Sequence, residues 1–256
     1  MKICRYAYEG SNHTGIIEDE TIREIQGNVL GDMHPTGQVH PLADAELLPP
    51  SSPTKMIGIG VNYKVHAKYG YAIPEEPLMF QKAVSALTGH NGNIIYPAAT
   101  KQLDYEGELA VVIGRETRHV SPADAPAHIL GYTCANDVTA RDIQAREHNN
   151  YGHSKCFDTF APMGPWIETD LDPSNLLLET FLNGQKKQSC STSDMAFSIN
   201  EIVAFVSDVM TLLPGDIIST GTPDGMGTMS VGDVVEVTIE GIGTLRNTVV
   251  APAERP

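Results

Sequence analysis

Short segments rich in β-branched and aromatic residues recur along almost the whole chain, and they restrict the fold more than any other feature. Val, Ile, Thr and Tyr are typical of strands, whereas the Gly, Asn and Asp between the segments are typical of turns. Helical patterns are few and do not alternate with the strands, which argues against repeated βαβ units. The sequence therefore predicts a mainly β protein of the α+β class. The expected strands are residues 2–8, 14–19, 21–27, 56–63, 108–114, 129–139, 164–170, 178–184, 216–220, 233–239 and 243–250.

One segment has the pattern of an amphipathic helix. Ser198 is followed three residues later by Glu201, which is the spacing of a capping box. Apolar residues then recur on one helical face, so we expect a helix over residues 198–210 with a buried side. Shorter helices are expected at residues 65–69 and 122–128.

A polar, proline-containing stretch at residues 47–55 divides the sequence. Pro-Pro and Ser-Pro dipeptides favour extended linkers. A chain of 256 residues is long enough for one or two domains. We therefore expect a small N-terminal β domain over residues 1–51 and a larger domain over residues 52–256.

The composition excludes several classes of partner. The 17 basic and 32 acidic residues give a formal net charge of −15, which disfavours binding to nucleic acid or to an anionic membrane surface. No apolar run approaches the roughly 18 residues that span a bilayer, and the start of the chain lacks the apolar stretch of a secretory signal. The 4 cysteines form no CxxC pair, so neither a zinc knuckle nor a disulfide framework is indicated. We expect a cytoplasmic protein that binds neither nucleic acid nor membrane.

Three carboxylates are the strongest local signal for chemistry. Glu106 and Glu108 are two residues apart before the apolar run LAVVIG, so in one strand they would point to the same face. Neighbouring buried carboxylates repel each other, and a divalent cation would remove that repulsion. Asp137 follows another apolar strand and adds a hard oxygen ligand, which suits Mg²⁺, Mn²⁺ or Ca²⁺ rather than zinc or copper. Spacing alone leaves two alternatives open, a solvated strand face for the glutamates and an N-cap for Asp137.

Five motifs occur in order between Lys55 and Val250: IGVNYKVHA, DYEGELAVVIG, GYTCANDVTARDIQ, SKCFDTFAPMGPW and TGTPDGMG. Together they resemble the fumarylacetoacetate hydrolase family over nearly all of this stretch, and the first fifty residues resemble the small N-terminal unit of bacterial members of this size. The resemblance implies a catalytic domain of curled mixed β-sheets over residues 52–256, and a homodimer.

The resemblance also implies roles for individual residues. Glu106, Glu108 and Asp137 would bind Mg²⁺ or Mn²⁺, with Ca²⁺ as a substitute in crystals. Lys155 would lie beside the metal, and His66 would act as a general base. The residues that would contact or approach the substrate are Arg141, Gln144 and Thr222.

Members of the family act on 2-oxo acids or their enols, so the implied substrate is a small anionic 2-oxo acid. The first hypothesis is metal-dependent hydrolysis of a C–C bond in an acylpyruvate or fumarylpyruvate type of substrate, through a metal-stabilised enolate. The alternative on the same scaffold is an enol–keto isomerase of the hydroxymuconate or 2-hydroxyhepta-2,4-diene-1,7-dioate type, or an oxaloacetate decarboxylase. A non-enzymatic cation-binding module is disfavoured, because three carboxylates without further ligands make a poor calcium site.

Two positions depart from the family pattern. Tyr69 stands where several hydrolases place a Glu that orients the ring of His66, and this favours the isomerase or decarboxylase alternative. Val61 stands where many members have an Arg that contacts a substrate carboxylate. Residues 61–77 combine polar residues with Gly70 and prolines, and we expect them to form a lid that orders over bound substrate.

Overall fold

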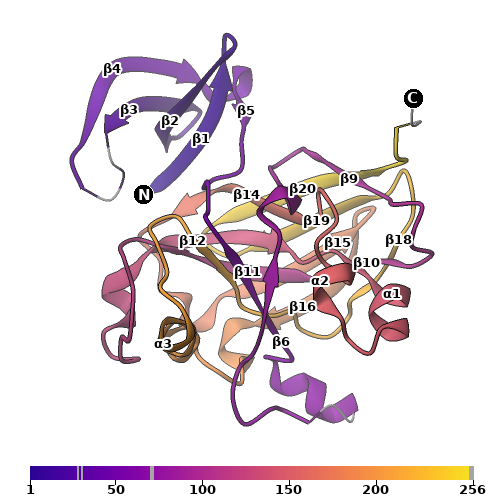
Figure 1. The fold of residues 1–256 in the computed structure, drawn as a ribbon. Coiled ribbons are helices and arrows are strands. Elements are labelled where there is room, and N and C mark those ends of the chain that lie inside the picture. The colour runs from indigo at the N-terminus through magenta and orange to yellow at the C-terminus, as the bar shows by residue number, and fades with distance from the viewer. Residues whose placement is uncertain (28, 30, 70–71, 254–256) are drawn as a thin grey trace.

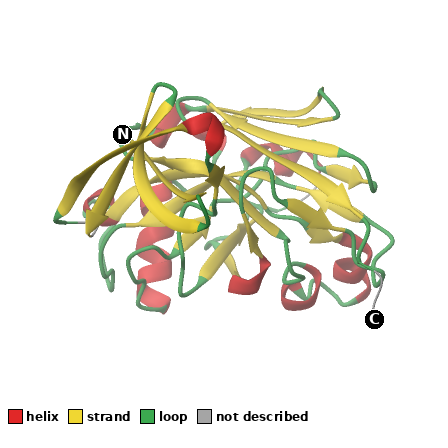
Figure 2. Cartoon of the chain, turned by 90° about the horizontal axis from the view of Figure 1, so that it is seen from above, coloured by secondary structure: helices red, strands yellow, loops and turns green. Residues whose placement is uncertain are grey.

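Strands are the main type of secondary structure, and the helices are short and lie at the periphery of the molecule (Figure 1, Figure 2). The computed structural model describes residues 1–27, 29, 31–69 and 72–253. Over these residues the three α-helices are α1 (Arg141–Arg146), α2 (Tyr151–Ser154) and α3 (Ile199–Val209), and none is long and apolar enough to span a membrane. The expected mainly β class is confirmed.

The largest sheet has 12 strands and runs the length of the molecule in the order β4-β3-β2-β1-β14-β12-β11-β17-β6-β7, with β5 paired to β1 and β8 paired to β14. Its strands are β1 (Lys2–Tyr8), β2 (Ser11–Glu18), β3 (Thr21–Gly27), β4 (Met33–Pro41), β5 (Glu46–Leu47), β6 (Met56–Gly60), β7 (Leu78–Lys82), β8 (Leu87–Thr88), β11 (Gly107–Ile113), β12 (Ile129–Asn136), β14 (Ala161–Glu168) and β17 (Ile217–Ser219).

Two smaller sheets complete the fold. A five-stranded sheet in the order β16-β15-β19-β20-β9 packs against the large sheet, and a three-stranded sheet in the order β13-β10-β18 lies beside it. Their strands are β9 (Asn93–Ile95), β10 (Leu103–Tyr105), β13 (Thr139–Ala140), β15 (Leu177–Leu182), β16 (Gln185–Ser191), β18 (Gly227–Met229), β19 (Val234–Ile239) and β20 (Gly243–Val250). The 3₁₀ helices are η1 (Leu42–Asp44), η2 (Lys64–Tyr69), η3 (Val84–Ala86), η4 (Ala125–His128), η5 (Pro173–Asn175) and η6 (Thr192–Asp194).

Strand β11 is the centre of the core, and every one of its residues is buried. Because side chains alternate along a strand, Leu109 and Val111 pack on one face against α3 and the five-stranded sheet, whereas Ala110 packs on the other face in a second core. A strand that is covered on both faces has a continuously apolar sequence, which explains the run LAVVI. The start of β11 is therefore a rigid platform for the residues beside it.

The structure confirms the local patterns and corrects their limits. Each expected strand segment overlaps a strand, and helix α3 begins with the expected capping box, in which Ser198 and Glu201 bond each other's backbone. The short helix expected over residues 122–128 is wrong in its extent, because only Ala125–His128 is helical and it is a 3₁₀ turn. The helix expected at residues 65–69 is likewise the 3₁₀ helix η2. The sequence did not predict the short helices α1 and α2 or the strands β4, β5, β7, β8, β9, β10, β16 and β18.

The N-terminal strands extend the large sheet. Strand β1 pairs with β14 in an antiparallel register that sets Lys2 opposite Glu168 and Ile3 opposite Ile167. Figure 1 shows the first four strands as a meander at one end of the molecule. The segment expected as a linker then leads into β6, which pairs in parallel with β17.

Asp216 fixes the segment that enters β6. Its carboxylate is fully buried and accepts hydrogen bonds from the backbone and hydroxyl of Thr54, the backbone and side chain of Lys55, and the backbone of Leu213. Burial alone would raise the pKa of Asp216, but the hydrogen bonds from Leu213, Lys55 and Thr54 outweigh burial and hold the pKa below the usual value of 3.8.

We predict that Asp216→Asn lowers the free energy of unfolding by about 3 kcal/mol at pH 7, because it leaves buried donors and the Lys55 ammonium without their anion. A depressed folded-state pKa stabilises above the unfolded pKa, so the difference from wild type should be full above about pH 5 and should shrink as the pH falls below 3.8. Urea unfolding at several pH values measures this, with the exposed Asp158→Asn as control. An equal deficit at pH 3 and pH 7 would contradict the role of the charge.

Candidate active site

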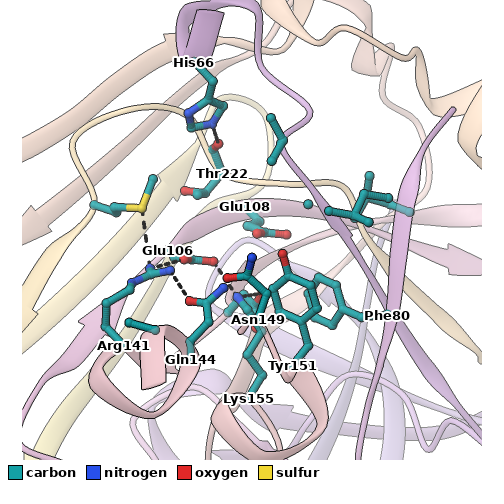
Figure 3. A pocket seen from close by; sticks show the side chains of 17 residues that line it. His66, Phe80, Glu106, Glu108, Arg141, Gln144, Asn149, Tyr151, Lys155 and Thr222 are labelled. Carbon is teal, nitrogen blue, oxygen red and sulfur yellow. Dashed lines mark hydrogen bonds and ion pairs between the residues drawn. The ribbon is translucent and has the colours of Figure 1, made fainter. Parts of the chain in front are cut away.

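All residues that were predicted for the site line one cavity of about 410 Å³ (Figure 3). They come from separate parts of the chain, so only the folded protein brings them together. The cavity-lining residues that the sequence singled out are His66 in η2, Glu106 between β10 and β11, Glu108 in β11, Asp137 after β12, Arg141 and Gln144 in α1, Lys155 after α2 and Thr222 after β17.

The register between β11 and β12 brings the three carboxylates together. Glu108 lies opposite Ala135, and the Asp137 backbone N–H donates to the carbonyl oxygen of Glu106 (2.8 Å). One potential ligand atom from each of Glu106, Glu108 and Asp137 lies within 4.8 Å of the others. Glu106 falls in the break between β10 and β11, so the two glutamates do not share one strand. Both carboxylates nevertheless face the cavity (Figure 3).

Ionisation of the Glu108 carboxyl group is unfavourable in the folded protein. Its side chain is buried, with 2% of the residue exposed. Burial, followed by repulsion from Asp137 and Glu106, raises the pKa of Glu108 to about 8. Hydrogen bonds from the Ser219 hydroxyl (2.5 Å) and the Gly221 backbone (2.9 Å) only partly compensate. The ionised form of Glu108 is therefore disfavoured in the metal-free protein.

Lys155 supplies a buried ammonium group inside the cavity. Its Nζ donates to Glu106 Oε2 (2.7 Å), Asp137 Oδ2 (2.5 Å) and the Thr139 hydroxyl (2.9 Å), and the ring of Phe80 lies 5.1 Å away. Burial opposes the charged form, but attraction by Asp137 and Glu106 outweighs burial and raises the pKa of Lys155. The ammonium group therefore stays protonated at neutral pH.

A second buried lysine, Lys82, was missed from the sequence. It lies at the end of β7 with 4% of its surface exposed, and its Nζ pairs with Asp137 Oδ1. Burial lowers the pKa of Lys82, and the attraction of Asp137 opposes this. The segment LMFQK carries no motif, and its alternation of apolar and polar residues is weak. A Lys at the end of an apolar strand was the only available signal, and it is a common feature of strands that end at the surface.

Helix α1 places a guanidinium group at the cavity wall. Arg141 Nε donates to Asp104 Oδ2 (2.9 Å), Nη1 donates to Gln144 Oε1 (2.5 Å), and Nη2 pairs with Glu106. Burial disfavours the charge, but Glu106 and Asp104 raise the pKa of Arg141. Arg141 and Gln144 therefore form a fixed pair of polar groups beside the carboxylates.

Thr222, in the loop after β17, and His66, in η2, lie at the other side of the cavity (Figure 3). The Thr222 hydroxyl donates to the Gly107 carbonyl (2.8 Å) and accepts from Gln188 Nε2 (2.8 Å). His66 is buried, and its Nε2–H donates to the Thr222 carbonyl (2.9 Å), so a neutral ring carries its lone pair on Nδ1. Residues 70–71 and the side chain of Tyr69 lie outside the described residues, so the roles of Tyr69 and of the lid stay predictions.

The three carboxylates fit a divalent cation. Opposite ligands of an ion with bonds of about 2.0–2.6 Å are about 4.0–5.2 Å apart, and the three ligand atoms lie within 4.8 Å of one another. All three atoms are hard oxygen donors, which Mg²⁺, Mn²⁺ and Ca²⁺ prefer. Repulsion from Asp137 and Glu106 also contributes to the raised pKa of Glu108, and a bound cation would offset that repulsion.

Two family models together cover nearly the whole chain. The model described as "Fumarylacetoacetate (FAA) hydrolase C-terminal" matches residues 55–250, and the model described as "Rv2993c-like, N-terminal" matches residues 1–50. Oxaloacetate tautomerase YisK of Bacillus subtilis is 45% identical over 213 residues, which are 77% of this chain and 70% of that protein.

Solved structures agree over almost the full length. The 2-hydroxyhepta-2,4-diene-1,7-dioate isomerase of Mycobacterium marinum is 44% identical with a TM-score of 0.93, and the match covers 99% of this chain and 100% of that chain. Maleylpyruvate hydrolase of Sphingobium sp. SYK-6, in complex with manganese(II) and pyruvate, is 29% identical with a TM-score of 0.82, and the match covers 98% of this chain and 99% of that chain.

We predict that Glu108→Gln affects stability and metal binding in opposite directions. Because the folded-state pKa of about 8 exceeds the usual 4.5, the metal-free wild type loses stability as the pH rises from 4.5 to 8. A neutral Gln removes this cost and should stabilise the metal-free protein by on the order of 2 kcal/mol at pH 8. It should also abolish the rise in Tm that Mn²⁺ gives the wild type.

Thermal unfolding in EDTA and in excess Mn²⁺ tests both effects, and the exposed Glu116→Gln is the control. A Glu108→Gln variant that is less stable than the wild type in EDTA would refute the electrostatic argument. A variant that keeps the full Mn²⁺ shift would remove Glu108 from the metal site.

Proposed function

The chain belongs to the fumarylacetoacetate hydrolase family, and from this premise we propose that it is a divalent-metal-dependent enzyme that interconverts the enol and keto forms of a small 2-oxo dicarboxylic acid. The observation that carries the proposal is the buried Lys155 ammonium group, which bonds two of three clustered carboxylates at the wall of a cavity. The choice of an enol–keto reaction over hydrolysis rests on the relatives, because the tautomerase and the isomerase are more similar to this chain than the hydrolase.

Glu106, Glu108 and Asp137 would hold the metal, and Mg²⁺ or Mn²⁺ are the ions that such oxygen ligands suit. The chemistry that a divalent cation supplies in such a site is Lewis-acid polarisation of the 2-oxo oxygen. The hydrolase neighbour in complex with manganese(II) and pyruvate supports this choice of ion and of ligand class.

The protein's own residues would then bind the substrate and stabilise the enolate. The Lys155 ammonium group remains charged and buried, so its attraction for an enolate oxygen is little screened by water. Arg141 and Gln144 would bind a substrate carboxylate, and Thr222 would contact the substrate from the opposite wall. His66 lines the cavity from the side opposite Lys155 (Figure 3), and an enol–keto reaction does not require it to activate water.

Hydrolysis of an acylpyruvate is the second candidate, and His66 favours it. An imidazole at the cavity wall is suited to activate a water molecule, which hydrolysis requires and tautomerisation does not. The two reactions share an enolate, so the same carboxylates and Lys155 would serve both. They differ in how strongly the rate depends on His66.

We predict that the purified protein with Mn²⁺ accelerates the ketonisation of enol-oxaloacetate well beyond the rate with Mn²⁺ alone. The loss of the ultraviolet absorbance of the enol measures this rate. EDTA should abolish the acceleration. Lys155→Met should lower kcat by on the order of 10²-fold or more while the protein remains folded, because it removes the main fixed cation. Hydrolysis is tested in parallel with acetylpyruvate and maleylpyruvate as substrates, and the released pyruvate is detected enzymatically.

His66→Ala separates the two candidates. A tautomerase should lose much less than the 10²–10⁴-fold in kcat that a hydrolase loses when its general base is removed. Rapid release of pyruvate from an acylpyruvate, with no ketonisation above the Mn²⁺ control, would overturn the proposal in favour of hydrolysis.

We also propose that the protein is a homodimer, on the strength of the family resemblance. Sedimentation velocity at micromolar concentration should give a species of twice the 27.6 kDa chain mass. A single species of 27.6 kDa would contradict the dimer.

A further inference from the structure

Asp137 is held by two lysines that approach it from different elements. Lys155 Nζ donates to Oδ2 (2.5 Å), whereas Lys82 Nζ pairs with Oδ1 and lies 3.4 Å from the Val138 carbonyl. Both lysines are almost completely buried. Each oxygen of this one carboxylate therefore has its own ammonium partner.

The two lysines differ in their relation to the cavity. Lys155 lines the cavity together with Asp137, but Lys82 is not part of the lining. Because Lys155 lines the cavity, Oδ2 is the oxygen that a cation bound in the cavity would share with Lys155. Oδ1 is paired with a lysine that is not part of the cavity lining.

Strand β7 is built to hold Lys82 in place. Leu78, Phe80 and Lys82 alternate along the strand, so they share one face, and the first two line the cavity. The backbone on both sides of Lys82 contacts Cys156, whose Sγ accepts from Ala83 N (3.3 Å) and donates to the Gln81 carbonyl (3.6 Å). Because Cys156 follows Lys155, these contacts tie the backbones of the two lysines together.

We propose that Lys82 is a positioning residue for the metal site: by occupying Oδ1 of Asp137 it fixes the carboxylate and leaves Oδ2 as the single ligand atom. The inference rests on the metal site of the proposed function and does not depend on which reaction the enzyme catalyses. A residue that bonds a metal-ligating side chain, without binding the metal itself, orients that ligand. Removal of such a residue usually weakens metal affinity 10–100-fold.

A purely structural ion pair would behave differently. Replacing a buried pair by apolar groups is often neutral for stability, so stability alone gives no reason for a lysine here. Removal of a positive charge beside a cation site should also strengthen cation binding by Coulomb's law. Positioning predicts the opposite sign, and the sign of the change therefore distinguishes the two roles.

The test measures Mn²⁺ binding to the full-length protein without substrate. The electron paramagnetic resonance signal of free Mn²⁺ reports how much Mn²⁺ remains unbound. Lys82→Met should bind Mn²⁺ 10–100-fold more weakly than wild type. The matched control is Lys55→Met, which removes another lysine paired with a buried aspartate, Asp216, outside the cavity. Its Mn²⁺ affinity should equal that of wild type.

Equal or tighter binding by folded Lys82→Met would overturn the inference. Wild type that binds no Mn²⁺ would instead refute the metal site itself, so the two failures are distinguishable. If Lys82→Met does not fold, a crystal structure of the wild type with Mn²⁺ decides the question. Retention of the Lys82 pair with Oδ1 and coordination through Oδ2 alone would support the inference, and bidentate coordination by Asp137 would overturn it.

Discussion

Three carboxylates buried at one end of the β11–β12 pair need positive charge, and the elements around them are arranged to supply it. Strand β7 brings Lys82, helix α1 brings Arg141, and the end of α2 brings Lys155. Breaking such a buried pair leaves an uncompensated charge at a cost of about 3–5 kcal/mol, so these elements are held to the core by the same charges that form the site. Burial, together with repulsion from Asp137 and Glu106, still raises the pKa of Glu108 to about 8.

The site divides into a rigid part and a peripheral part. The carboxylates stand on or beside β11 and β12, whose side chains are buried in the core on both faces. The cationic and polar groups that would meet the substrate stand on α1, α2 and η2, which are short and lie at the edge of the molecule (Figure 1). A metal site needs fixed ligands, whereas a substrate must enter and leave, and the two requirements are met by different elements.

Glu108 shows the cost of this arrangement for stability. A carboxyl group with a raised pKa, buried at the start of β11, destabilises the metal-free fold at neutral pH. Such a residue is explained by binding and not by folding. The same reasoning applies to Lys82, which is buried without contact to the cavity and has one carboxylate as its partner.

The sequence by itself was enough for the fold class, the strand segments, helix α3 and the identity of the cavity residues that the family motifs contain. Those features are local, because alternation, the Ser198–Glu201 capping box and contiguous motifs are all encoded within a few residues. The tertiary structure alone decided that Asp137 sits beside Glu106 through the β11–β12 register, and that Lys82 reaches Asp137 across 55 residues. Which strands pair, and in which register, depends on the packing of the whole core, so contacts between distant segments leave no pattern in the sequence near either partner.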